Sequence, residues 1–278
     1  MKKILILSVG IVLLISSCCK EKEVTIEKEV VKKQIDSLFN SEHLSMATLW
    51  FQKAAEAKAT YYQNFNIAKL ILDDKIKKDR FKLKKKMPKA IITDIDETVI
   101  DNSPYNAKLI LSGKSYNKKS WEEWVNEKRA KPTAGALEFC KYAKEKGVEI
   151  FYVSNRSEKS IDATLENLKN AGFPYADKKH IYLKTTTSDK TERRNKILKN
   201  YDVILYLGDN LRDFDETFGG RGADFGFGIT KENKETFGTK FIVFPNPMYG
   251  EWEKGLYKGD FSKSDEEKRQ MRKDALIK

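Results

Sequence analysis

The sequence predicts an α/β fold in which a parallel β-sheet is covered by helices on both faces. After about residue 88, short apolar runs alternate with stretches of helical periodicity, a pattern typical of parallel sheets. The runs contain few alternating polar residues, as expected for strands buried on both faces. Polar and charged residues follow four of the five runs, which is where such sheets bind ligands. Together these observations predict a domain whose site lies at the carboxyl ends of its strands.

The first 17 residues have the composition of a secretory signal peptide. The stretch MKKILILSVGIVLLISSC has two lysines, then a largely apolar run over residues 4–15, then small residues before Cys18. That run is too short for a comfortable transmembrane helix. Residues 15–18 resemble the bacterial lipobox, in which cleavage precedes a cysteine that becomes lipid-modified, with palmitate among its acyl chains. We therefore expect a lipoprotein signal peptide at 1–17, lipidation of Cys18 and a charged tether over 18–35. An uncleaved anchor helix is the alternative.

The chain is basic, with a formal net charge of +12. Cleavage after residue 17 would remove Lys2 and Lys3 and leave +10. A basic surface favours anionic partners such as phosphorylated metabolites or lipid headgroups. The densest basic run, residues 75–89, has helical spacing and favours a solvated helix face over a nucleic-acid groove. We therefore expect no nucleic acid polymer as a partner.

Cysteine and histidine usage excludes two kinds of chemistry. The chain has three cysteines and two histidines, with no CxxC pair and no Cys/His cluster of zinc-ligand spacing. Neither His43 nor His180 lies in a recognisable motif, so a histidine-nucleophile phosphatase has no support. Cys140 lies within a helical pattern and is expected to be a buried, small apolar residue.

The elements follow one another along residues 36–278, which we expect to form the folded domain. Residues 36–85 have apolar side chains at helical intervals, and Pro88 ends this segment. The apolar runs predict strands at residues 90–93, 148–154, 180–183, 203–207 and 241–244. Helical patterns lie at residues 135–146, 160–171 and 191–199. We expect residues 36–85 and an insertion at about 105–131 to form a small helical cap over the pocket.

The residues that follow the predicted strands carry the chemistry. The first strand is followed by three carboxylates within four residues: Asp94, Asp96 and Glu97. Because the carboxyl ends of parallel strands meet at one edge of a sheet, the polar groups there are expected to converge on one pocket. The other strand ends supply Ser154, Asn155, Arg156, Lys190, Asp209 and Asp213.

These groups suit phosphoryl transfer. Asp94 and Asp96 are two residues apart, so on an extended chain their side chains leave on the same side. One carboxylate can attack phosphorus while the other handles the proton of the leaving oxygen. Carboxylates repel a phosphate dianion, and Mg²⁺ would relieve that repulsion, with Asp209 as the second carboxylate ligand. Donors for the phosphoryl oxygens are available at Ser154, Asn155 and Lys190.

Two stretches, DIDETVIDNSPY at 94–105 and VILYLGDNLRDF at 203–214, resemble the paired signatures of the class C acid phosphatases. These are bacterial lipoprotein 5′-nucleotidases of the haloacid dehalogenase (HAD) superfamily. An SNR stretch and a lysine lie between the two signatures in the same order, and the resemblance covers about residues 36–260. It implies a Rossmann-like HAD core with a parallel sheet flanked by helices, plus a small helical cap. It also implies Mg²⁺ and an aspartyl-phosphate intermediate.

The resemblance implies a role for each residue that matches the family's motifs. Asp94 would be the nucleophile and a metal ligand. Asp96 would act as acid and base, and would bind the metal through its backbone carbonyl. Asp209 would complete the metal site, with Asp213 supporting a ligand. The substrate-binding positions would be Ser154, Asn155, Lys190, Trp121 and Tyr249.

Several of these residues also have a purely structural interpretation. Arg156 either binds phosphate or pairs with an acidic neighbour, and Asp213 is a ligand's support or a helix-start carboxylate. Glu97 is expected to be an acceptor that orders its loop. Trp121 and Tyr249 either stack on a flat base or belong to the packing of the core or cap.

The predicted function is an Mg²⁺-dependent acid phosphatase and 5′-nucleotidase, acting on nucleoside monophosphates or other small phosphomonoesters. One alternative is a broad-specificity acid phosphatase for aryl phosphates or phosphotyrosine, and another is a surface lipoprotein that binds a ligand without catalysis. The expected location is the bacterial cell envelope, lipid-anchored in the outer membrane and facing the periplasm or the outside. The preferred base and the oligomeric state, with a homodimer as one option, stay open.

Overall fold

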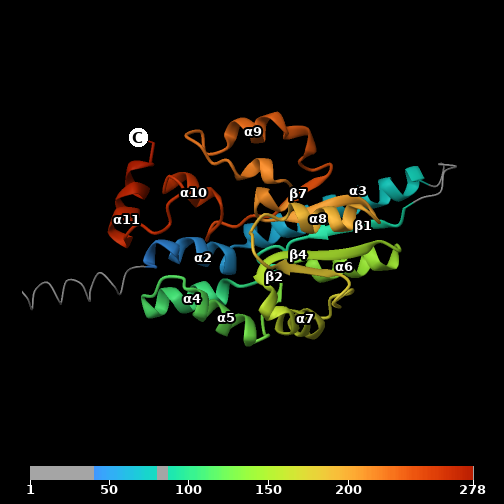
Figure 1. Ribbon diagram of the computed structural model, residues 1–278, viewed down its shortest axis with the longest axis horizontal. Helices are drawn as coiled ribbons and strands as arrows, with labels where there is room; N and C mark the ends of the chain where they lie inside the picture. The colour runs from blue at the N-terminus through green and yellow to red at the C-terminus, as the bar shows by residue number, and fades with distance from the viewer. Residues whose placement is uncertain (1–40, 80–86, 278) are drawn as a thin grey trace, which may run out of the picture.

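The computed structural model describes residues 41–79 and 87–277, and within them five strands form one parallel sheet (Figure 1). The strand order is β5-β4-β1-β6-β7. The central strand β1 pairs in parallel with β4 on one side and β6 on the other, so that Ile91 lies opposite both Ile150 and Leu205. The strands are β1 (Lys89–Thr93), β4 (Glu149–Ser157), β5 (Ile181–Lys184), β6 (Asp202–Gly208) and β7 (Phe241–Val243).

Helices and short turns surround this sheet. The α-helices are α2 (Ser45–Lys53), α3 (Ala55–Asp79), α4 (Ser103–Ser112), α5 (Lys118–Asn126), α6 (Ala136–Glu145), α7 (Ile161–Asn170), α8 (Thr191–Leu198), α9 (Phe227–Glu232), α10 (Trp252–Leu256) and α11 (Asp265–Asp274). The 3-10 turns are η1 (Glu42–Leu44), η2 (Glu158–Ser160), η3 (Leu211–Asp213), η4 (Glu216–Gly219) and η5 (Lys234–Thr236). A small antiparallel pair joins β2 (Ile100–Asp101) to β3 (Lys131–Pro132) on either side of the α4–α5 insertion.

The sheet sends alternate side chains into two apolar cores. On one face, Ile91, Ile150 and Leu205 belong to the core that α3, α6 and α7 complete. On the other face, Ile92 and Val153 belong to a second core with residues of α8 and of the segment after β6. Because both faces are covered, the strands are apolar almost throughout, and the predicted α/β fold with a parallel sheet is confirmed.

The five strands and three helices predicted after residue 88 all form, with small shifts at their ends. The largest shift concerns β4, which runs on to Ser157 beyond its predicted end at residue 154. Its pairing with β5 changes register between Val153 and Ser157. Residues 154–156 therefore leave the regular ladder, although they lie within the strand.

The helical segment before the sheet is divided between the core and the pocket. Helix α3 packs against α6, β6 and β7, and its Phe65 and Leu72 are buried in the core. In contrast, η1 and α2 lie beside α4, and Ser41 and Leu44 line the pocket described below. Within the segment expected to form the cap, α3 therefore belongs to the core, while η1 and α2 lie beside the pocket, because helical periodicity does not tell which neighbour a helix covers.

Cys140 is fully buried in α6, as expected for a small apolar residue. The predicted signal peptide, the lipidated Cys18 and the charged tether lie outside the described residues. In the parts that are described, 41–79 and 87–277, none of the helices combines the length and apolarity that a membrane crossing requires.

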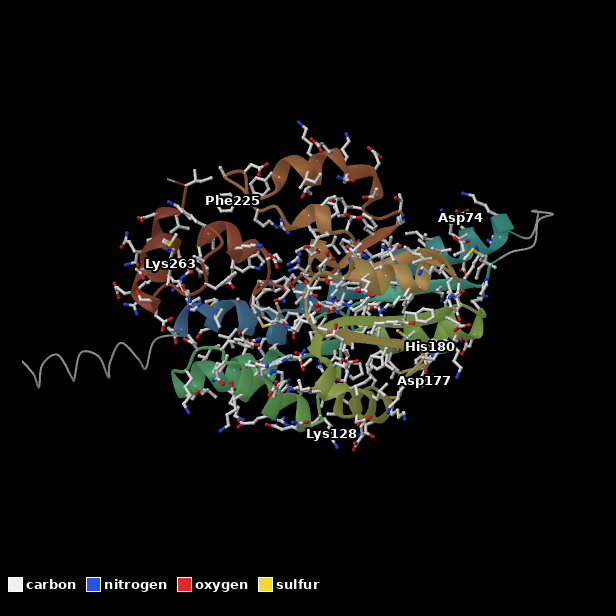
Figure 2. The ribbon with its side chains drawn as sticks, viewed as in Figure 1. Asp74, Lys128, Asp177, His180, Phe225 and Lys263 are labelled. Carbon is white, nitrogen blue, oxygen red and sulfur yellow. The ribbon has the colours of Figure 1, made fainter. Side chains whose placement is uncertain are left out.

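His180 lies at the start of β5, away from the strand ends that carry the predicted site. Its Nδ1 is 2.8 Å from Asp177 Oδ1, and its Nε2 is 2.8 Å from Glu149 Oε2 at the start of β4. Figure 2 labels His180 and Asp177 close to each other. Lys179 and Tyr201 also donate to Glu149. Burial would raise the pKa of Glu149, but these hydrogen bonds lower it below its usual value. We therefore assign His180 a structural role in joining β4 to β5.

Candidate active site

A pocket of about 590 Å³ lies beyond the carboxyl ends of β1, β4 and β6. Small-molecule sites span roughly 300–1,000 Å³, so this pocket is large enough for a metabolite. The structure brings all the predicted site residues of its described part to this pocket. They are Asp94, Asp96, Trp121, Ser154, Asn155, Arg156, Lys190, Asp209, Asp213 and Tyr249.

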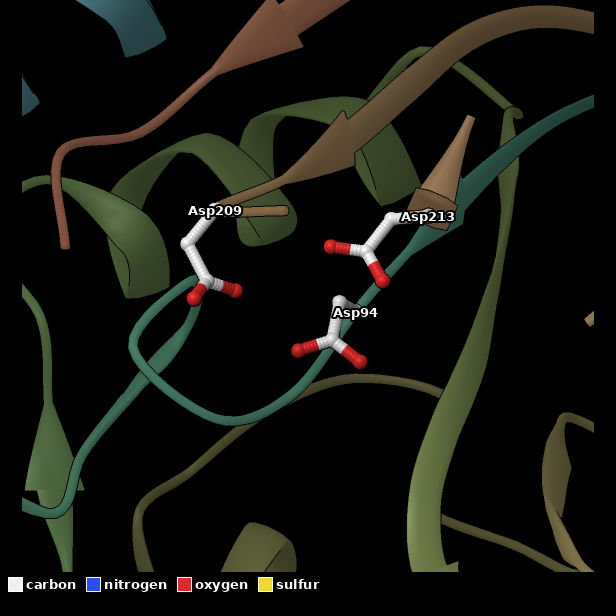
Figure 3. Close-up of side chains that lie close together, drawn as sticks. All are labelled: Asp94, Asp209 and Asp213. Carbon is white, nitrogen blue, oxygen red and sulfur yellow. The ribbon is translucent and has the colours of Figure 1, made fainter. Parts of the chain in front are cut away.

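Three carboxylates meet at the base of the pocket. Asp94, Asp209 and Asp213 each offer an oxygen, and these oxygens lie within 4.8 Å of one another (Figure 3). The backbone N–H of Asp94 donates to Leu207 O at 2.8 Å, which continues the pairing of β1 with β6 up to the site. Gly208 makes the cluster sterically feasible, because a Cβ there would lie 2.6 Å from Asp213 Cβ.

Lys190 supplies one positive charge to this cluster. Its buried ammonium contacts Asp94 Oδ1 and lies 2.7 Å from Asp213 Oδ1. Burial alone would lower the pKa of Lys190, but the carboxylates of Asp213 and Asp94 raise it above its usual value. One ammonium against three carboxylates leaves an excess of negative charge.

Burial, together with this excess of negative charge, raises the pKa of two of the acids. Burial, with help from Asp213 and Asp96, raises the pKa of Asp94 to about 7, although Lys190 acts in the opposite direction. Burial and the charges of Asp213 and Asp94 raise the pKa of Asp209 well above its usual value. Buried like charges are costly unless a counter-charge is present, so the cluster is suited to a cation.

Asp209 is held by two residues that the sequence reasoning did not single out. Thr98 Oγ1 donates to one carboxylate oxygen at 3.1 Å, and Asn246 Nδ2 donates to the other at 2.9 Å. The Asn246 side chain also accepts the backbone N–H of Met248 at 3.0 Å, so it links Asp209 to the loop of Tyr249. An asparagine between two prolines is a turn signal, and it could have drawn attention to this residue.

Asp96 is held from three sides within the pocket. Arg156 Nη2 lies 2.7 Å from Asp96 Oδ1, and Asn102 Nδ2 donates to the same oxygen at 2.8 Å. Ser154 Oγ donates to Oδ2 at 3.2 Å. Arg156 therefore pairs with an acidic neighbour, Asp96, as one of its two interpretations proposed. It also lines the pocket, as its other interpretation, phosphate binding, requires.

Glu97 accepts hydrogen bonds that order its loop. It has a left-handed backbone with φ of 54° and is fully buried. Its carboxylate accepts the N–H of Asn102 at 2.7 Å, and its carbonyl accepts the hydroxyl of Tyr61 from α3. Burial, and then Asp96 and Asp209, raise the pKa of Glu97 well above its usual value. These contacts agree with the structural role expected for it.

Asp213 combines a helix-start role with a place in the acidic cluster. It belongs to a capping box with Asn210 at η3, and Asn210 N–H donates to its Oδ2 at 2.9 Å. Its other oxygen faces Lys190. The helix-start interpretation therefore holds, and Asp213 also contributes charge directly to the site.

Aromatic side chains line the outer part of the pocket. Trp121 from α5 packs edge-on against Tyr105 from α4, with ring centroids 5.2 Å apart. The guanidinium carbon of Arg156 lies 5.7 Å from the Trp121 ring centroid. Tyr249 comes from the segment after β7 and is partly buried. This part of the pocket offers flat apolar faces beside the polar base.

Comparison with known proteins identifies the family. A model of the HAD superfamily, subfamily IIIB (acid phosphatase), matches residues 14–252. The chain belongs to this family. Two structures of the class C acid phosphatase from Bacillus anthracis are similar to it, each with 86% of this chain and 98% of that one covered. The structure with tungstate bound is 42% identical, with a TM-score of 0.80, and the other is 41% identical, with a TM-score of 0.81.

Curated plant proteins also match part of the chain. Acid phosphatase 1 of Solanum lycopersicum is 29% identical over 128 residues, which is 44% of this chain and 50% of its own length. The stem 31 kDa glycoprotein of Glycine max is 27% identical over 164 residues, 57% of this chain and 58% of its own. The chain spans about half the length of the curated relatives it matches. The predicted resemblance to class C acid phosphatases is confirmed.

The base of the pocket contains the kinds of groups that an acid phosphatase requires. The carboxylates at its base can act as nucleophile, acid, base and metal ligands. The ammonium and the hydroxyl beside them can hold an anion.

The C-terminal segment adds Tyr257 and Phe261 to the pocket lining. Sequence reasoning missed these two residues because they follow the last predicted strand, in a segment without a recognisable motif.

Proposed function

We propose that the chain is an Mg²⁺-dependent phosphomonoesterase, an acid phosphatase that acts as a 5′-nucleotidase through an aspartyl-phosphate on Asp94. One observation carries the proposal: Asp94, Asp209 and Asp213 meet Lys190 and Ser154 in a single pocket. Membership of the acid phosphatase family supports it.

The residues at the base of the pocket fit a hard divalent cation. Three carboxylate oxygens lie within 4.8 Å of one another, and among the described residues Lys190 is the cation in direct contact with Asp94 and Asp213. Mg²⁺ prefers one or two carboxylates together with phosphate oxygens and water. Asp94 and Asp209 would hold it, with the backbone carbonyl of Asp96 and with Asp213 beside them. When bound, the cation supplies positive charge that offsets the charge of the phosphoryl group.

The first step transfers the phosphoryl group to the enzyme. Asp94 attacks phosphorus through Oδ2, because Oδ1 contacts Lys190. The bond from phosphorus to the ester oxygen breaks, and Asp96 donates a proton to that leaving oxygen. Lys190, Ser154 and Asn155 hold the phosphoryl oxygens as their charge spreads. The products of this step are an alcohol and an aspartyl-phosphate.

The second step releases phosphate. Asp96, now ionised, accepts a proton from a water molecule, whose oxygen attacks phosphorus. The bond from phosphorus to Asp94 breaks and regenerates the carboxylate, and inorganic phosphate leaves. Arg156 and Asn102 keep the Asp96 carboxylate within the pocket through both steps, since both donate to Asp96 Oδ1.

We propose nucleoside monophosphates as substrates because the aromatic lining suits a flat base. Stacking of a base on an aromatic side chain contributes about 1–3 kcal/mol in nucleic-acid binders. Trp121 and Tyr249 are the side chains assigned to this contact, and both line the pocket. Tungstate, bound in one Bacillus anthracis structure, is a tetrahedral oxyanion like phosphate, which supports a phosphate-like group as a ligand of this chain.

The test is phosphate release from AMP and from an aryl phosphate by the purified full-length protein, with Mg²⁺ and with EDTA. We expect release that requires the metal, a higher kcat/KM for AMP, and loss of release in Asp94→Asn. Asp202→Asn is the matched control, because this carboxylate lies at the opposite end of β6 and pairs with Lys89. A preference for the aryl phosphate would favour the broad-specificity alternative. A folded protein that releases phosphate from neither substrate would overturn the proposal in favour of a binding lipoprotein.

We further propose that the protein is a lipoprotein of the bacterial outer membrane, anchored through Cys18. The lipobox-like residues before Cys18 support the lipid anchor. We expect globomycin to block processing, and outer-membrane fractions from a sucrose gradient to contain the wild-type protein but not Cys18→Ala. An unchanged distribution of Cys18→Ala would contradict the anchor.

A further inference from the structure

Arg193 lies beneath the pocket without lining it. It is the third residue of α8 and is buried, with 8% of its surface exposed. Its Nη1 donates to Ser154 O at 2.6 Å, and its Nη2 donates to Asn155 Oδ1 at 2.7 Å. The same Nη2 lies 3.0 Å from Asp189 O and 3.3 Å from Ser188 O. One guanidinium therefore joins the end of β4 to the loop that precedes Lys190.

This guanidinium has no carboxylate partner within 4.0 Å among the described residues, and neutral oxygens accept all its hydrogen bonds. Burial, together with Arg194, lowers the pKa of Arg193, while more distant carboxylates such as Asp94 raise it. Burying a cation without a direct counter-ion is unfavourable for stability. Such a group is better explained by what it holds in place than by the stability it adds.

The contact with Asn155 fixes the orientation of an amide in the pocket. A guanidinium can only donate, so it requires the amide oxygen and leaves the Asn155 NH₂ group free to donate. Asn155 is exposed and lines the pocket, so its donor is available to an anion there. Without Arg193 the amide could turn over and present its oxygen, which would repel a phosphoryl oxygen.

The contacts with the carbonyls of residues 188 and 189 hold the loop that positions Lys190. Both carbonyls belong to the loop immediately before Lys190, whose ammonium reaches Asp94 and Asp213. The contact with the carbonyl of Ser154 fixes the residue whose hydroxyl faces Asp96. Ser154, Asn155 and Lys190 come from two separate segments, and Arg193 sets the distance between them.

We propose that Arg193 is a positioning residue that holds Ser154, Asn155 and Lys190 as one rigid set of donors for a phosphoryl group. This inference rests on the proposed function, but binding of inorganic phosphate tests it without turnover. A misplacement of about 1 Å at a catalytic group can lower the rate about 100-fold. Removal of the guanidinium should therefore weaken anion binding and catalysis together, although Arg193 touches neither substrate nor cation.

The experiment compares Arg193→Met and Arg193→Lys with the wild-type holoprotein. Calorimetry with inorganic phosphate should show affinity that is about 10-fold weaker in Arg193→Met, and kcat/KM on AMP should fall about 10- to 100-fold. Arg193→Lys should recover only part of both, because one ammonium cannot span the two segments. Arg221→Met is the matched control, since Arg221 is partly buried and, like Arg193, donates to a backbone carbonyl, that of Phe225, but within the described residues it makes no hydrogen bond to Ser154, Asn155 or the loop before Lys190.

A double-mutant cycle tests the action through Asn155. Arg193→Met and Asn155→Ala together should weaken phosphate binding by less than the product of their separate effects, because both disturb the same donor. Effects that multiply would contradict this link. Phosphate affinity equal to wild type in folded Arg193→Met or Arg193→Lys would overturn the positioning role. A wild-type protein that binds phosphate but hydrolyses no ester would reject the proposed function and leave this inference standing.

Discussion

The raised pKa of Asp94 makes the stability of the site depend on pH and on a bound cation. This pKa is raised to about 7 by burial and by the neighbouring Asp213 and Asp96, against an ordinary value of 3.8. Between these values the carboxyl binds a proton in the folded, metal-free protein but not in the unfolded chain. The metal-free protein therefore loses stability as pH rises through this window. A bound cation reverses this dependence, because a carboxylate must lose its proton to act as a ligand.

We predict that the stabilisation by Mg²⁺ increases with pH between about 4 and 7, the window between the ordinary and the raised pKa of Asp94. The measurement is the difference in Tm between samples with Mg²⁺ and with EDTA, taken at each pH so that other pH effects cancel. In Asp94→Asn this difference should be smaller and should depend less on pH, because one titrating ligand is gone. A Tm difference that is independent of pH would contradict the link between Asp94 and the cation.

Gly208 is a second residue on which the site depends. An added Cβ would lie 2.5 Å from Asp213 Oδ2 and 2.6 Å from Asp213 Cβ, so Asp213 would have to move. We predict that Gly208→Ala destabilises the protein by about 1–3 kcal/mol, as overpacked sites do. It should also lower kcat on AMP at least about 10-fold by displacing Asp213 and, through it, Lys190.

Gly222→Ala provides the control for this substitution. A Cβ at Gly222 meets nothing within 4 Å, and this variant should keep both stability and activity. Activity of Gly208→Ala equal to that of the control would mean that Asp213 can move without consequence, which would contradict its assignment to the site.

At the scale of elements, α3 is part of the core although it precedes the sheet by sequence. Its Phe65 is 3% exposed and packs against Phe139 of α6 and Phe244 after β7, with ring centroids 5.5 Å and 4.5 Å apart. Tyr61 of the same helix donates to the carbonyl of Glu97 in the loop that follows β1. Helix α3 therefore supports the site from below rather than closing over it.

This placement predicts that Phe65→Ala lowers the free energy of unfolding by about 3–5 kcal/mol, as expected for an emptied aromatic site. Leu70→Ala on the same helix is the control, because Leu70 is 71% exposed and should change stability by less than about 0.5 kcal/mol. Urea denaturation measures both. A small effect of Phe65→Ala on stability with a large effect on KM would instead favour a lid.

At the scale of the whole molecule, much of the fold and most of the site could be predicted from the sequence. Alternating apolar and helical segments predicted the sheet, and the rule that parallel strands end at one edge predicted that Asp94, Ser154, Lys190 and Asp209 would meet. Both predictions depend on local pattern plus a general rule of topology. The carboxylates and the lysine could be recognised from the sequence because charged side chains that directly follow apolar strands are costly to bury and seldom serve packing.

The remaining features depend on contacts that no local pattern encodes. Asn246 and Thr98 support Asp209 from loops that lie far from it in sequence. Arg193 looked like one of many basic residues on a helix, and only the folded chain shows that it bonds to Ser154 and Asn155. The placement of α3 required knowledge of its neighbours, since a helix of any amphipathic pattern can cover a core or a pocket.

The central claim is that the phosphoryl group passes through Asp94. The most direct test is a single-turnover reaction of the full-length protein and Mg²⁺ with AMP that carries a radiolabelled phosphate, quenched in acid within the first turnover. We expect the label on the protein, in the peptide that contains Asp94, with none in Asp94→Asn or in EDTA. Release of labelled phosphate during the first turnover without labelled protein, or a label on another residue, would contradict the account.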